Sequence, residues 1–330
     1  MSNALKRTIG ATIMASLFLS ACASVPHGPA LSLANAGVAT TSTFSTNVRT
    51  TASQVQYVDV TEAFVATYDY CANPALPCSP QLQSGAMVKL RQDLANVILL
   101  RAKAIDALGK AYGALKTEAE YDARGDLVSA TNSAIEGVNN FAAAALAIGG
   151  AAPAAALIGE PLKQITGFGV GLLADRNQRR RLLAGSEAIA AATKQLRDAL
   201  AVEAFVYDSL ADYIEKSRTA AKIRMLDAGL VSNTDALMPM AANLGLKPVS
   251  GVDAVIAKSP QTKIALTAML QAQSRADVQL DKDKYQASIA ALDALLRAHD
   301  ELKKNQSVSL ADVDRFLGEL NASLDAGKKE

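Results

Sequence analysis

Long stretches with apolar residues at helical spacing limit what this chain of 330 residues can fold into. In the clearest stretch, from Leu82 to Tyr121, apolar residues recur at steps of three, four or seven and therefore share one face of a helix. The spacing predicts a helix of about ten turns with charged residues largely outside this face. The apolar residues are Leu90, Leu94, Val97, Ala104, Leu108, Tyr112 and Leu115, and the charged ones include Lys89, Arg91, Asp93, Lys103, Asp106 and Lys110.

Similar faces predict helices at about 31–70, 126–148, 189–225, 260–304 and 309–324. Gly229 stands where a C-cap belongs, and Ser259-Pro260 is typical of an N-cap followed by proline at the first helical position. Ser309 and Asp312 are spaced as a capping box. Residues 230–259, rich in proline and glycine, predict a looser connection.

Composition agrees with a helical fold, because the chain has 65 Ala against 10 Pro and 20 Gly. No alternating strand pair with a turn signal competes with the helices. We therefore expect an all-α protein, an elongated antiparallel bundle of about six or seven helices that forms a single domain over residues 31–330.

The amino end has the features of an export signal. Lys6 and Arg7 precede an apolar stretch from Ile9 to Leu19 that is too short to span a bilayer as a helix. The stretch ends in Leu19-Ser20-Ala21-Cys22, which resembles the lipobox of bacterial lipoproteins. The resemblance implies that residues 1–21 are a signal peptide, that Cys22 receives acyl chains, palmitate among them, and that residues 22–30 are a tether to the membrane. Ala23 after the cysteine implies sorting to the outer membrane, with the body facing the periplasm.

Cys71 and Cys78 lie in a segment with three prolines, Pro74, Pro77 and Pro80, that predicts a bend between two helices. In an oxidising compartment two cysteines this close favour a disulfide. A redox pair usually has only two residues between its cysteines, whereas six separate these two.

One segment in the middle of the chain lacks charge. Residues 138–159 contain no Asp, Glu, Lys or Arg, and after Glu160 and Lys163 the stretch 164–174 is again uncharged. Three interpretations stay open, the third of which is a partner-binding groove. In the first, small residues in 138–174 let two helices pack closely in the bundle, and the solvated start of the next helix contains Arg176, Arg179, Arg180 and Arg181. In the second, the two uncharged halves form a hairpin that enters a bilayer. The second layout is similar in organisation to α-helical pore-forming toxins, and its apolar residues are Phe141, Leu146, Ile148, Leu157, Ile158, Phe168, Val170, Leu172 and Leu173.

Residues typical of catalysis are scarce. His27 falls in the tether, and His299 lies on an apolar face whose neighbouring helical positions, Leu295 and Lys303, cannot complete a metal site. We expect no cofactor, no metal and no enzymatic activity. We also expect no binding of nucleic acid, because a formal net charge of +1 gives no positive electrostatic potential that would attract a polyanion. The sequence predicts a lipid-anchored envelope lipoprotein that binds or scaffolds an envelope protein or a second copy of itself, with no small-molecule substrate; membrane insertion through 138–174 is the alternative.

Overall fold

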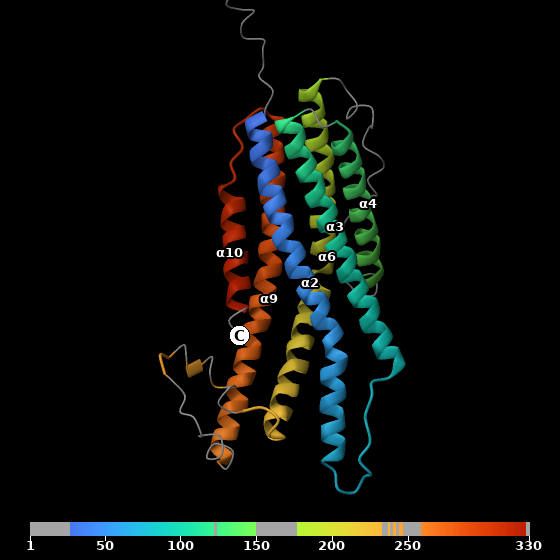
Figure 1. The fold of residues 1–330 in the computed structure, drawn as a ribbon, viewed down its shortest axis with the longest axis vertical. Helices are drawn as coiled ribbons and strands as arrows, with labels where there is room; N and C mark the ends of the chain where they lie inside the picture. Colours follow the sequence, from blue (N-terminus) through green and yellow to red (C-terminus); the bar gives the residue numbers. More distant parts are fainter. Residues whose placement is uncertain are drawn as a thin grey trace, which may run out of the picture.

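The computed structural model describes residues 27–121, 124–149, 177–232, 237, 240–241, 244–246 and 259–327. Within these residues the chain forms long helices that run side by side, and it contains no strand (Figure 1). The prediction of an all-α, elongated bundle is therefore confirmed. The helices are α2 (His27–Cys71), α3 (Gly85–Glu120), α4 (Arg124–Gly149), α6 (Gln178–Asp227), α9 (Pro260–Lys303) and α10 (Ala311–Gly327).

The helix ends follow local sequence signals, with two corrections. The Ser84 side chain accepts the backbone N–H of Met87 at the start of α3, and Gly229 adopts φ +68° just after α6, as a C-cap requires. However, α2 begins at His27, inside the predicted tether, because the His27 ring bonds the Ala119 carbonyl at 2.8 Å. The predicted capping box is wrong: α10 begins only at Ala311, and the N–H of Ser309 donates to Glu301 instead.

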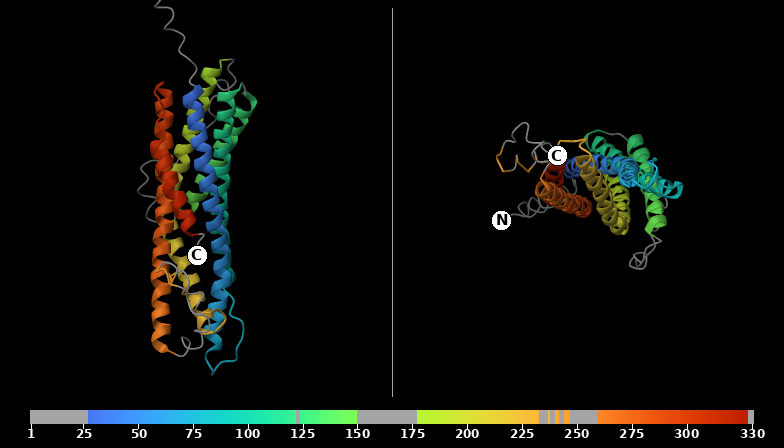
Figure 2. Two further views of the ribbon diagram at one scale, coloured as in Figure 1. Left: turned by 60° about the vertical axis from the view of Figure 1, so that its left-hand side comes forward. Right: turned by 90° about the horizontal axis from the view of Figure 1, so that it is seen from below.

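The long helices alternate in direction, so the bundle has two distinct ends (Figures 1 and 2). At the upper end, α2 and α6 begin and α3 and α9 finish. At the lower end, α2 and α6 finish and α9 begins, whereas α3 begins higher, on the right of Figure 1. Two ion pairs join three helices at the lower end: Arg224 of α6 with Asp69 of α2, at 2.7 Å, and Lys263 of α9 with Asp227, at 3.2 Å. The helix ends are thereby held in register.

The main core runs from the upper end of the bundle to Val58 of α2 and Tyr285 of α9, with α4 packed on α3 and α6, and α10 folded back along α9. The predicted apolar face of α6 is buried from Ile189 to Ala221, and Met225 at the end of that face is half-buried. Packing is closest where α2 crosses α3, since a Cβ added at Gly37 would overlap the ring of Tyr112. Only glycine at position 37 allows the two helices to approach this closely.

Candidate functional site

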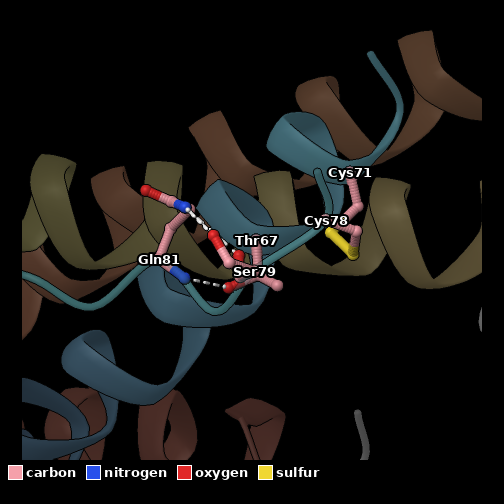
Figure 3. The surroundings of a disulfide bond; sticks show 5 residues. All are labelled: Thr67, Cys71, Cys78, Ser79 and Gln81. Carbon is pink, nitrogen blue, oxygen red and sulfur yellow. Dashed lines mark hydrogen bonds between the residues drawn. A yellow bond between two sulfur atoms is a disulfide. The ribbon is translucent and has the colours of Figure 1, made fainter. Parts of the chain in front are cut away.

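The bend between α2 and α3 is closed by a disulfide, as the sequence predicts (Figure 3). Cys71 and Cys78 have their Cα atoms 4.6 Å apart. The N–H of Gln81 donates to the Thr67 hydroxyl at 2.9 Å, and the Gln81 side chain donates to Ser79, so the bend folds back along the last turns of α2. The bend is therefore a fixed corner at the lower end of the bundle.

The uncharged segment is described only in part. In α4, Phe141 is fully buried, Leu146 is half-buried and Ile148 belongs to the last turn. Val138, Ala142 and Ala145 are buried with Phe141 in the core. The beginning of the segment therefore packs inside the bundle, and none of the described helices has the length and apolarity to span a membrane. The lipidation residue Cys22 and the other predicted insertion residues lie outside the described part: Leu157, Ile158, Phe168, Val170, Leu172 and Leu173.

Arg181, predicted to belong to a solvated helix start, is fully buried, and this prediction is corrected. Its guanidinium donates from Nε at 2.9 Å and from Nη2 at 2.7 Å to Oε1 of Glu118, which is also fully buried. The Gln178 side chain donates to the Glu118 carbonyl at 2.7 Å. A buried cation is stable only when it is paired. The Glu118 carboxylate on α3 therefore allows Arg181, and with it the first turn of α6, to pack in the core.

Arg91 and Leu90 exchange the positions that the sequence predicts for them. Arg91 has only 6% of its side chain exposed, and it pairs with Asp59 and Glu62 on α2 while donating to the Tyr213 hydroxyl at 2.6 Å. Leu90 is 60% exposed. Neighbouring residues on a helix point about 100° apart, so turning Arg91 toward the α2 carboxylates turns Leu90 outward.

A second buried pair lies at mid-height. Arg101 on α3 donates to Glu203 on α6 at 2.9 Å, and its guanidinium lies over the rings of Tyr207 and Tyr285. The two rings stack at 4.3 Å, and the Tyr285 hydroxyl donates to the Leu200 carbonyl at 2.7 Å. The arrangement fixes how α3, α6 and α9 pair and leaves no access for a substrate.

His299 lies in a buried polar cluster near the upper end. Its Nδ1 is 2.7 Å from the Ser186 hydroxyl and its Nε2 is 2.9 Å from the Tyr112 hydroxyl, which also lies 3.1 Å from Thr193. Burial lowers the pKa of His299 to about 3, so the ring is neutral at pH 7. A serine beside a histidine resembles part of a catalytic set, but with 3% of His299 exposed the pair is sealed from solvent. The cluster cross-links α3, α6 and α9.

Two grooves open on the surface between helices. One of about 620 Å³ runs between α3 and α4 over Ala107, Ala114 and Ala130, with Lys103 and Lys110 on its rim. The other, of about 460 Å³, runs between α6 and α9 over Ala190 and Ala191. Small residues on the floor and charged residues on the rim suit contact with another helix. Among the described residues no group of three or more His, Cys, Asp or Glu could hold a metal ion.

Comparison of the chain with models of protein families, with curated proteins and with solved structures finds no match.

Proposed function

We propose that the protein is a lipid-anchored envelope lipoprotein that acts as a binding or scaffolding protein at the outer membrane, facing the periplasm. The observation that carries this proposal is Leu19-Ser20-Ala21-Cys22 after a basic and then apolar leader. Acyl chains at Cys22 would hold the chain at a bilayer, since each buried CH₂ contributes about 0.8 kcal/mol.

The position of α2 supports a scaffolding role. The helix begins at His27, five residues after Cys22, and five extended residues reach at most about 18 Å. The anchor would therefore keep the upper end of the bundle close to the membrane. Because α6 has 50 residues, and a helix rises about 1.5 Å per residue, the body would extend about 75 Å from that point.

The buried ion pairs support the same role, because they hold the helices of the body in one register. A body with fixed helices presents its two surface grooves in a constant geometry, which favours a helical partner: an envelope protein or a second copy of this chain.

Mass spectrometry of the protein purified from membranes tests the anchor. The expected result is an N-terminal Cys22 with a mass increase for its acyl chains, and a Cys22→Ala variant that is recovered in the soluble fraction. An unmodified N-terminus, or a wild-type protein found in soluble extracts, contradicts the proposal.

A second function is supported by the uncharged residues 138–159: insertion of 138–174 as a membrane hairpin. Insertion would have to expose Phe141, which α4 buries in the core. Release of dye from liposomes by the acyl-free chain, abolished by Phe168→Asp in a variant that still folds, is the result this hypothesis predicts. Absence of leakage, or a Phe168→Asp variant that only unfolds, leaves residues 138–174 as packing residues.

A further inference from the structure

The groove between α3 and α4 has lysines without a carboxylate partner. Lys103 and Lys110 are exposed on its α3 side, and neither forms an ion pair with any other residue that the structure describes. Asp106, which lies between them, is already neutralised by Arg49 of α2. Asp126, the other acid of the groove, lies in the first turn of α4, where it interacts favourably with the helix dipole. The groove therefore presents two unpaired cations beside a floor of alanines.

The groove between α6 and α9 differs, because its cations are paired. Lys194 lies 2.6 Å from Asp198. Arg197 lies 2.9 Å from Asp293. Charge therefore selects a partner only at the groove between α3 and α4, and the partner that fits there is a helix with acidic side chains.

The chain itself contains such a helix, α10, on the other side of the bundle. In Figure 1 α10 lies on the left and α4 on the right, and the view from below in Figure 2 agrees. The inner face of α10 packs on α9 and α2, and the outer face is open to solvent. The outer face carries small residues with acids beside them: Gly318 and Ala322, with Asp312, Asp314 and Glu319, all exposed.

The single basic residue of α10 does not reverse the charge of this face. Arg315 lies 3.3 Å from Asp312, and its guanidinium lies over the Phe316 ring at 4.5 Å. The helix has four acids against this one base. Lys328 and Lys329 follow the end of the helix in sequence and lie outside the described residues. The outer face of α10 is therefore acidic, and it complements the lysines of the groove.

The first acids of α10 lie at the height of Lys110. Asp312 lies 2.9 Å from Arg297 of α9. Two residues further along α9, the His299 ring lies 2.9 Å from the Tyr112 hydroxyl, and Tyr112 follows Lys110 by two residues on α3. Asp312 and Lys110 are therefore at about the same level of the bundle, on different sides of it.

The match recurs lower down. Lys103 precedes Lys110 by seven residues on α3, which runs upward, so it lies about 10.5 Å lower. Glu319 follows Asp312 by seven residues on α10, which runs downward, so it also lies about 10.5 Å lower. Two copies that stand side by side at one level would bring lysines and acids together at both heights.

We propose that the groove between α3 and α4 binds α10 of a second copy of this chain. The contact joins two different surfaces, so further copies add to it as a ring or an open row, with all upper ends on the same side. It specifies the partner of the proposed scaffolding role. Only the position of the row on one membrane rests on the proposed acyl anchor, whereas the contact between copies does not.

Sedimentation velocity tests the contact, using the chain from residue 22 onward with Cys22→Ser so that no acyl group contributes. We expect the wild type to self-associate as its concentration rises. A groove variant, Lys103→Glu with Lys110→Glu, and a helix variant, Asp314→Lys with Glu319→Lys, should each weaken self-association by about tenfold or more, because like charges then meet. All four side chains are exposed, so circular dichroism should show the helix content of the wild type in both variants.

A mixture of the two variants gives a sharper result. The groove variant keeps an intact α10 and the helix variant keeps an intact groove, so the mixture should form a dimer with one chain of each kind and nothing larger. A single chain with all four changes again has opposite charges on the two surfaces and should self-associate. The matched control, Lys89→Glu with Lys304→Glu, changes two exposed lysines outside the groove and should behave as the wild type.

Four results would overturn the proposal. They are a wild type that stays monomeric at concentrations up to about 1 mM, self-association of the groove and helix variants equal to that of the wild type, an equal loss in the control variant, and a mixture of folded variants that forms no dimer. The state of Cys22 is measured separately by mass spectrometry, so failure of the anchor and failure of the contact between copies give different results.

Discussion

Arg181 of α6 and Glu118 of α3 form an ion pair in which neither side chain is exposed to solvent, with Nη2 of the arginine 2.7 Å from Oε1 of the glutamate. The pair lies near the upper end, where it joins the first turn of α6 to the last turns of α3. Desolvation of two charges offsets much of their attraction, so the pair contributes more to register than to net stability.

Removal of one partner should be much more harmful than replacement of both. Glu118→Ala or Arg181→Ala leaves an uncompensated charge in the core and should lower the free energy of unfolding by about 3 to 5 kcal/mol. The double variant Glu118→Leu with Arg181→Leu should recover most of that loss. Urea denaturation of the three variants measures both effects, and equal losses in all three would show that the charges do not depend on each other.

The buried histidine predicts a pH dependence of stability. Burial lowers the pKa of His299 from 6.5 to about 3, so between these values the unfolded chain binds a proton that the folded chain does not. The contribution of the neutral ring to the free energy of unfolding is complete above pH 6.5. It is lost as the pH falls toward 3, by about 1.4 kcal/mol per pH unit. Denaturation at pH 7.5, 6, 5 and 4 should therefore show a steeper decline for the wild type than for His299→Gln. Parallel curves would mean that the ring is protonated in the folded state.

The sequence predicts the helices well because their apolar faces are local patterns, and it predicts the disulfide because Cys71 and Cys78 are near each other in the chain. It fails at Arg181 and Arg91, since the acids that bury these arginines come from other helices: Glu118 is 63 residues away from Arg181 in sequence, and Asp59 is 32 residues away from Arg91. A charged side chain by itself indicates a surface position, and only a partner of opposite charge on another helix reverses that prediction. Burial of His299 is predicted from its apolar face, but its bonds to Tyr112 and Ser186 depend on how three helices align.

Two glycines in the interior of helices offer a matched comparison. Gly37→Ala on α2 would place a Cβ inside the Tyr112 ring, which is itself fully buried, so we expect a loss of about 2 to 3 kcal/mol. Gly113→Ala on α3 meets no atom within 4 Å and should stabilise the protein by up to about 1 kcal/mol. Thermal unfolding of both variants checks the opposite signs. A loss at Gly113 equal to that at Gly37 would show that α3 does not pack as described.

The corner disulfide should stabilise the bend between α2 and α3. Its loop is short, with a sequence separation of 7, so Cys71→Ser with Cys78→Ser should lower the free energy of unfolding by about 2 to 3 kcal/mol. The matched control is Leu76→Ser in the same loop, because Leu76 is an exposed residue whose replacement should leave stability unchanged. Urea denaturation of both variants measures the two effects, and a double serine variant as stable as the wild type would show that the closed loop does not restrict the unfolded chain.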